Sequence, residues 1–129
     1  SIFGRKVLNG ESPVIFGDGT QERSFTYVKD VVGINMLVAE KEGTRGEAYN
    51  CASGITVTIS ELADMVKKAL GREDLETQYA DWTIGDIKHF EVSNEKIKKL
   101  GFEFKTPFEK GLKETLEWLK VYLGECNVK

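Results

Sequence analysis

One segment constrains this chain more than any other: between a short apolar strand and a helix it places two glycines within three positions. Val14 to Phe16 predict the strand, and Gly17-Asp18-Gly19 predict a turn, because glycine tolerates positive φ. Asp30 is a residue type that caps helices and predicts a helix beginning at Val31. Arg23 then falls on the connection, where its planar fork of donors can grip a phosphate at two oxygens.

The composition indicates one globular domain over residues 1–129. The chain has 129 residues, 40% of them hydrophobic and 10% aromatic, and only two prolines. Disordered segments are poor in such side chains, and this length lies within the usual domain range of about 100 to 150 residues. We therefore expect a compact fold with a real hydrophobic core.

Charge and residue usage exclude several classes of function. The net charge is -3, whereas nucleic-acid binding needs a concentrated basic face, so we expect no nucleic-acid partner. The sequence has no run of about 20 apolar residues and no leader-like start, and we expect no membrane partner and a cytoplasmic protein. Cys51, Cys126 and the single histidine, His89, have no ligand-like spacing, so we assign no metal.

Hydrophobic periodicity predicts helices that alternate with short strands. Thr58 and Glu61 form a capping-box pattern, and the stripe Leu62, Met65, Val66 and Ala69 predicts a helix that ends at Gly71. The other expected elements are a helix over 2–9, an amphipathic helix over 31–41, strands over 47–52, 56–58 and 75–80, and a short helix between Ser93 and Gly101.

A final helix is expected after Thr106-Pro107, where Glu109 completes a second capping-box pattern. Leu112, Leu116, Leu119 and Leu123 recur every three to four residues and place this helix against a core. The fold class predicted from all these elements is α/β (mixed α+β), with short strands and about four to five helices.

These residues resemble a known family. Gly17-Asp18-Gly19, Gln21, Arg23, Phe25, Tyr27-Val28 and Asp30 are similar to the GDGxQxRxFxYVxD signature of the extended short-chain dehydrogenases/reductases, the NAD-dependent nucleotide-sugar epimerases and dehydratases. Three later landmarks follow in the family's order: Tyr49-Asn50 with Ser53-Gly54, Gly85-Asp86-Ile87, and LGFEFKTPFEKGLKETLEWL from Leu100 to Leu119.

The resemblance covers only the C-terminal part of such an enzyme. Family members begin with a Rossmann domain whose GxxGxxG loop holds NAD and whose Tyr-x-x-x-Lys carries the chemistry, and neither pattern occurs in these 129 residues. We therefore expect a fragment: a small lid-type substrate-binding domain without the Rossmann domain and without catalytic residues. NAD would belong to the full-length parent, and none is expected to bind this chain.

The resemblance implies roles for two residues of the signature. Arg23 occupies the position that contacts the nucleotide diphosphate, and Phe25 stands where the family has an aromatic beside it. Each has a structural alternative that the sequence leaves open. Arg23 can pair with Glu22 or Asp18 at the surface, and Phe25 can be a packing residue of the core.

The resemblance also implies ligand contacts for three apolar residues. Val14 and Phe16 match the strand beside the nucleotide base, with Phe16 offering a flat surface to a pyrimidine, and Ile59 matches an apolar contact at the start of the next helix. Buried strands and helices also need such residues, so core packing remains the alternative for all three.

Asp86 matches an aspartate that accepts hydrogen bonds from ribose hydroxyls. The sequence departs from the family nearby, because Thr83 stands where a second diphosphate arginine is usual and Ser24 where an aspartate or asparagine is common. Lys88 is a candidate replacement for the missing positive charge.

The resulting hypothesis is the nucleotide-sugar-binding domain of a UDP-glucose 4-epimerase-like enzyme, not catalytically competent alone. The expected partners are a UDP- or dTDP-sugar and the missing Rossmann domain. Alternatives are a dTDP-glucose 4,6-dehydratase and a non-enzymatic stand-alone module or degenerate remnant with the same fold. Exposure of Phe16 and Phe25 in the isolated domain would favour self-association.

Overall fold

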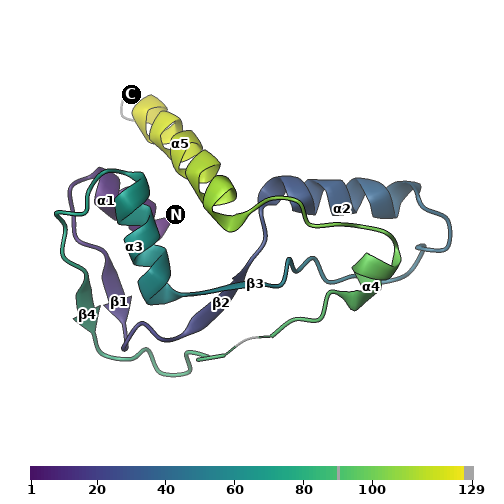
Figure 1. Cartoon of the computed structure of the whole chain (residues 1–129), viewed down its shortest axis with the longest axis horizontal. Coiled ribbons are helices and arrows are strands. Elements are labelled where there is room, and N and C mark those ends of the chain that lie inside the picture. Colours follow the sequence, from purple (N-terminus) through teal and green to yellow (C-terminus); the bar gives the residue numbers. More distant parts are fainter. Residues whose placement is uncertain (90, 127–129) are drawn as a thin grey trace.

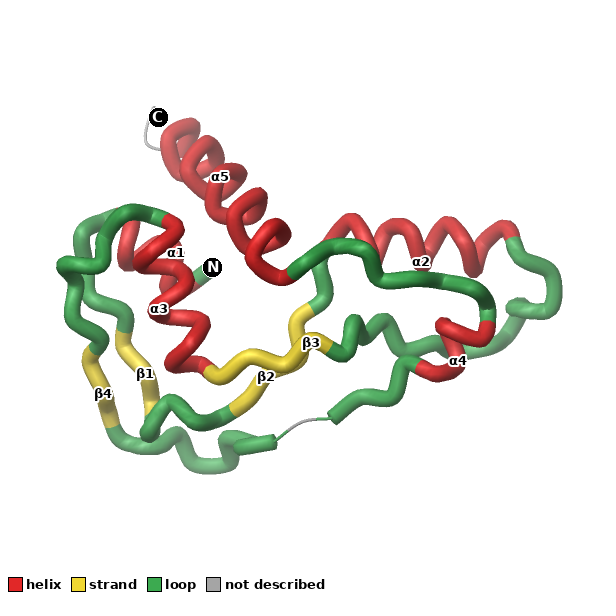
Figure 2. The backbone as a smooth tube through the Cα atoms, in the orientation of Figure 1, coloured by secondary structure: helices red, strands yellow, loops and turns green. Residues whose placement is uncertain are grey.

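Five helices and four short strands make up the part of the chain that the structure, a computed structural model, describes: residues 1–89 and 91–126 (Figures 1 and 2). In chain order they are α1 (Ile2–Leu8), β1 (Val14–Phe16), β2 (Glu22–Phe25), α2 (Val28–Glu40), β3 (Ile55–Thr58), α3 (Ile59–Ala69), β4 (Gln78–Ala80), α4 (Glu95–Lys99) and α5 (Phe108–Cys126). The mixed α/β class predicted from the sequence is confirmed.

The strands form two separate two-stranded sheets. β1 runs parallel to β4, with Ile15 opposite Tyr79. β2 runs antiparallel to β3, with Arg23 opposite Val57 and Phe25 opposite Ile55. Because β2 follows β1 after a short turn, the two sheets meet at that turn (Figure 2).

The main core lies where α1, α3 and α5 pack together, on the left in Figure 1. Val7, Val66, Leu116 and Leu119 are buried there, which confirms the leucine periodicity of the last helix. A β-carbon built on Gly4 would lie 2.8 Å from a methyl of Leu119, so α1 and α5 approach closely. The expected stripe of α3 is wrong at one position, because Ala69 is exposed while Ala63 is buried.

α2 begins one turn earlier than expected, at Val28, so Asp30 is not its N-cap. Tyr27 is the extended residue before the helix, and Asp30 lies in the first turn, where a carboxylate favours the helix dipole. Asp30 is buried and accepts a hydrogen bond of 3.1 Å from the hydroxyl of Thr106, two residues before α5. The Thr106 hydroxyl is thus used in a contact between segments far apart in the sequence.

Residues 47–52 do not form the expected strand. Side chains, and not a neighbouring strand, satisfy carbonyl groups of this segment: Thr26 donates to the Cys51 carbonyl at 3.1 Å and Asn94 to that of Ala52 at 2.8 Å. A strand needs a paired backbone beside it, and apolar sequence alone does not supply one.

The capping box predicted at the start of α3 is present. The Thr58 hydroxyl accepts from the Glu61 amide at 3.1 Å, and the Glu61 carboxylate accepts from the Thr58 amide at 2.9 Å. The Thr58 hydroxyl also donates to the Glu61 carboxylate at 2.8 Å. The bonds that this carboxylate accepts from the Thr58 amide and hydroxyl lower the pKa of Glu61. The cap of α4 is Asn94, one residue after the expected Ser93.

Two kinds of feature are absent from the described residues. No helix among them combines the length and apolar character needed to cross a bilayer. Over the same residues, no group of three or more His, Cys, Asp or Glu side chains is placed to hold a metal ion. Cys51 is a free thiol, and the side chain of Cys126 lies outside the described part.

Candidate functional site

The site begins at the turn that links β1 to β2. Gly17 has a φ of 91°, a conformation that favours glycine, and its amide donates to the Ala80 carbonyl at 2.8 Å. The Asp18 carboxylate accepts from the hydroxyl of Thr20 at 2.6 Å and from its amide at 2.9 Å. The bond from the Thr20 hydroxyl is the main cause of the lowered pKa of Asp18. The predicted Gly-Asp-Gly turn therefore exists and is internally braced.

Trp82, which the sequence reasoning did not single out, covers this turn. A β-carbon at Gly17 would lie 2.5 Å from the indole, so only a glycine allows the ring to sit there. The ammonium of Lys88 lies 4.7 Å from the centre of the Trp82 ring, a cation–π contact. The loop over residues 81–89 is thus held against the turn.

Arg23 lies within β2 and not on a connection, contrary to expectation. Its Nη2 forms an ion pair with Asp86, while Nη1 donates to the carbonyls of Ile87 at 2.6 Å and Glu22 at 2.8 Å. The side chains of Arg23 and Asp86 are 32% and 23% exposed, so both can still reach solvent. The structure brings together the two residues to which the family resemblance gives the diphosphate and the ribose.

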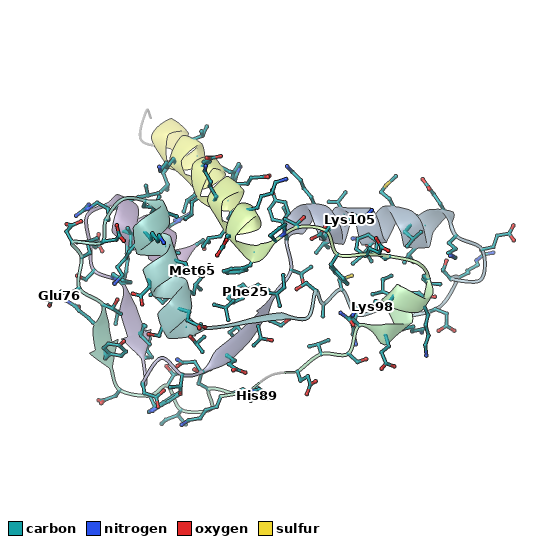
Figure 3. All side chains as sticks on the ribbon, viewed as in Figure 1. Phe25, Met65, Glu76, His89, Lys98 and Lys105 are labelled. Atoms are coloured by element: carbon teal, nitrogen blue, oxygen red, sulfur yellow. The ribbon has the colours of Figure 1, made fainter. Side chains whose placement is uncertain are left out.

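The pairing of Arg23 with the carboxylate of Glu22, which the sequence left open, does not occur in the structure. One oxygen of this carboxylate lies 2.7 Å from Nδ1 of His89, whose side chain is 73% exposed at the lower edge of the molecule in Figure 3. The Glu22 amide also donates to the Lys88 carbonyl at 2.9 Å, which ties the loop to β2. His89 lies in the loop and not in a strand, and Phe90 is outside the described residues.

Phe25 is a packing residue in this structure. Its ring lies 5.2 Å from that of Phe108, centre to centre, at an angle of 56°, and joins β2 to the first turn of α5 (Figure 3). The expectation that Phe25 is exposed in the isolated domain is therefore wrong, since it is half-buried by α5. Phe16, by contrast, is 53% exposed, as expected.

The remaining predicted residues lie on two elements beside the turn. Val14 and Phe16 flank the fully buried Ile15 on β1. Ile59 is the first residue of α3, and its amide donates to the Gln21 carbonyl at 3.0 Å. Val14 and Ile59 are half-buried.

Gln21 is a second residue whose importance sequence reasoning missed. It is 3% exposed, and its Nε2 donates to the Phe16 carbonyl at 2.7 Å, which fixes the turn from inside. Its Oε1 is buried and has no hydrogen-bond partner among the described residues. Its place in the signature was the available signal, since buried side-chain amides usually hydrogen-bond to other groups of the protein.

A shallow groove lies elsewhere, between α3 and the start of α5. Its volume is about 610 Å³, and its lining includes the apolar residues Val57, Met65 (labelled in Figure 3), Pro107 and Phe108 and the acidic residues Glu61, Asp64 and Glu109. None of the six predicted residues lines it, so it is separate from the Arg23–Asp86 pair.

This fold, with a braced Gly-Asp-Gly turn and an arginine that meets the aspartate of a Gly-Asp turn, matches part of the fold of the nucleotide-sugar epimerases among the extended short-chain dehydrogenases/reductases. Residues 1–52 match the profile of the NAD dependent epimerase/dehydratase family. The chain belongs to that family.

Three similar proteins illustrate the relationship. The crystal structure of UDP-glucose 4-epimerase from Thermotoga maritima with UDP-glucose superposes with a TM-score of 0.86 at 36% identity over 95% of this chain. The structure of UDP-N-acetylglucosamine 4-epimerase from Methanobrevibacter ruminantium superposes with a TM-score of 0.85 at 37% identity over 94% of this chain. The mouse dTDP-D-glucose 4,6-dehydratase is 32% identical over 82% of this chain. The chain spans 39%, 38% and 31% of their respective lengths.

Proposed function

We propose that this chain binds a nucleotide sugar, as the substrate-binding domain of a UDP-glucose 4-epimerase-like enzyme, and that it performs no chemistry alone. The observation that carries the proposal is the contact between Arg23 and Asp86, which are far apart in the sequence but adjacent in space. A cation for the diphosphate and an acceptor for the ribose then lie side by side. The crystal structure of the Thermotoga maritima epimerase with UDP-glucose supports the choice of ligand.

Arg23 has donors left for a phosphate. A guanidinium carries five N–H groups, and the contacts with Asp86, Ile87 and Glu22, its partners among the described residues, use three of them. The backbone contacts hold Nη1 in place, so the remaining two donors are oriented before a ligand arrives. Such preorganisation reduces the entropy lost on binding.

The base would lie beside β1. Phe16 presents its exposed ring there, and its carbonyl is fixed by Gln21, so the end of the strand is rigid. A flat apolar ring suits a uracil or thymine equally well, because stacking depends little on the identity of the base. Stacking on Phe16 therefore suits a pyrimidine nucleotide but does not by itself separate UDP from dTDP.

Positive charge near the diphosphate would come from Lys88 as well as Arg23. Thr83 supplies none, whereas the ammonium of Lys88 is held over Trp82 beside the Gly17 turn. A lysine acts as a point charge and lacks the bidentate geometry of an arginine. We expect weaker diphosphate binding than two arginines would give.

The described residues do not fit NAD. A dinucleotide loop needs a glycine-rich turn that opens directly into a helix, whereas Gly17 and Gly19 lead into β2, and Trp82 and Ser60 occupy the space beside them. In this proposal NAD, hydride transfer and proton transfer belong to other parts of a full-length enzyme. The residues of this chain would position the sugar nucleotide for that chemistry.

Two alternatives make different predictions. A dTDP-glucose 4,6-dehydratase, which the mouse relative favours, would prefer dTDP-glucose over UDP-glucose. A non-enzymatic module with the same fold, which Thr83 favours, would bind neither better than it binds phosphate. Comparing the two sugar nucleotides with a phosphate control therefore separates the three hypotheses.

The experiment is a backbone amide NMR titration of the 129-residue chain with UDP-glucose, dTDP-glucose and inorganic phosphate. We expect shifts at Phe16, Arg23 and Asp86 with the sugar nucleotides at concentrations where phosphate has no effect. Arg23→Met should abolish them. Arg72→Met is the matched control, because Arg72 pairs with Asp74 on a different surface. An unchanged response in Arg23→Met, or no response in the parent chain, would contradict the proposal.

A further inference from the structure

One face of α5 carries large apolar side chains that the described residues cover only in part. Trp118, Val121 and Tyr122 are 60%, 61% and 40% exposed, whereas Leu116 and Leu119 of the same helix are buried in the main core. Spacings of three and four residues put the three exposed side chains on one side of the helix. We call these three residues the α5 aromatic face.

The two rings of this face are ordered within a single copy of the chain. The centres of the Trp118 and Tyr122 rings lie 5.2 Å apart, and the rings are stacked at an angle of 18°. Tryptophan and tyrosine are among the residue types that contribute most to protein–protein interfaces. A pair that is already stacked loses less side-chain entropy on binding. The α5 aromatic face therefore has the character of a protein contact.

Two opposite charges flank the face along one edge. Glu117 and Lys120 are both exposed, and neither forms an ion pair within residues 1–89 and 91–126. With 3.6 residues per turn, the two side chains leave the helix about 60° apart. A surface with one charge of each sign on the same edge is complementary to a copy of itself that runs in the opposite direction.

We propose that the α5 aromatic face is an interface between two copies of this chain, whose α5 helices pack antiparallel. A two-fold axis that brings Glu117 of one copy level with Lys120 of the second copy also brings Lys120 level with Glu117. That axis passes between Trp118 and Leu119, so the two Trp118 rings meet at the centre. A parallel pair would instead set each charge level with its own copy.

The size of the face predicts a weak, reversible dimer. Buried tryptophan and tyrosine contribute about 150–250 Å² each, so the exposed parts of the three side chains offer on the order of 300 Å² per copy. Twice that area is below the roughly 1,200 Å² of a stable interface. The two ion pairs are exposed and add little affinity. We expect a dissociation constant on the order of 100 µM.

This pairing leaves the candidate ligand site open. α5 projects from the top of the molecule in Figure 1, whereas the loop that carries Asp86 runs along the bottom. Dimer formation should therefore leave nucleotide-sugar binding unchanged, and the inference does not depend on the function proposed above.

The test is sedimentation of the 129-residue chain at concentrations up to about 1 mM. The chain carries Val32→Lys and Met36→Lys, because these residues form a separate exposed apolar surface on α2. We expect a monomer–dimer equilibrium that Trp118→Ser weakens at least about tenfold, with unchanged helix content by circular dichroism. A monomer at every concentration, or a dimer that Trp118→Ser leaves unchanged, would overturn the inference.

Charge exchange in the same chain tests the antiparallel orientation. Glu117→Lys or Lys120→Glu alone should weaken the dimer about three- to thirtyfold, because like charges then meet twice. An equal mixture of the two variants should recover the original affinity, since every lysine then faces a glutamate. Lys98→Glu, on α4 (Figure 3), is the matched charge control and should change the affinity less than about twofold. A mixture that associates no better than either variant alone would refute the pairing.

Discussion

Trp82 covers Gly17 so closely that a β-carbon at position 17 would lie 2.5 Å from the indole Cε2. Trp82 is 37% exposed and the ammonium of Lys88 lies 4.7 Å from the centre of its ring, so the turn, the indole and the ammonium form one stack. This stack joins the first sheet to the loop that carries Asp86. The position of Asp86, the candidate acceptor for ribose hydroxyls, therefore depends on the contact between Trp82 and Gly17.

Gly17→Ala should destabilise the fold by about 2–4 kcal/mol, because alanine disfavours positive φ and its methyl would displace Trp82. Gly85→Ala is the matched control, since Gly85 has a φ of 86° but open space around it, and should lose only about 1–2 kcal/mol. Urea denaturation measures both. Equal losses would show that Trp82 does not rest on Gly17.

Phe25→Ala should lower the free energy of unfolding by about 2 kcal/mol, because its ring packs on Phe108. Phe16→Ala should lose less than about 1 kcal/mol, since that ring is 53% exposed. A double-mutant cycle between Phe25 and Phe108 should give a coupling of about 0.5–1.5 kcal/mol. If the coupling is near zero and Phe25→Ala affects only ligand binding, the packing role of Phe25 is contradicted and a contact with the ligand is favoured.

The stability of the chain should fall with acid through the capping box of α3. The pKa of Glu61 is lowered in the fold from an ordinary value of 4.5, so its contribution is complete above that pH and is lost as the pH falls through the folded value. Glu61→Gln keeps a capping-box acceptor but cannot titrate. Its unfolding free energy, from urea curves at a series of pH values, should fall less steeply below pH 4.5. Parallel curves for the two proteins would refute the assignment.

Self-association of the chain remains a prediction, and the structure points to α2 as a second site for it, apart from α5. Val28, Val32 and Met36 recur every four residues on this helix and are 62%, 56% and 57% exposed. Val32→Lys combined with Met36→Lys should lower the average mass seen by sedimentation while leaving thermal stability nearly unchanged. Lys68→Ala, on an exposed face of α3, serves as the control. A parent chain that sediments as a monomer would contradict the prediction.

Local signals in the sequence predicted local structure well. The capping box of Thr58 and Glu61 and the leucine repeat of α5 depend on residues three or four positions apart, and both are confirmed. The start of α2 was missed because Asp30 satisfies both a cap and a first-turn role, and the buried contact with Thr106 decides between them.

Contacts between distant segments could not be predicted in the same way. The family resemblance assigned Arg23 to the diphosphate and Asp86 to the ribose of one ligand. No pattern in either segment shows that the two residues bond to each other. Trp82 lies in a loop that shows no hydrophobic periodicity, and its partner, Gly17, has no side chain to indicate the contact. The absent strand over 47–52 is a similar case, because pairing depends on a neighbour and not on the segment itself.

The close approach of Gly4 to Leu119 has a consequence for how this protein is made. α1 leaves the ribosome long before α5, yet Val7 and Leu116 belong to one buried cluster. Contacts between such distant segments are slow to form because a long loop must close first. During synthesis, therefore, the side of α1 that faces α5 stays uncovered until α5 has been translated, and this part of the core cannot form before then.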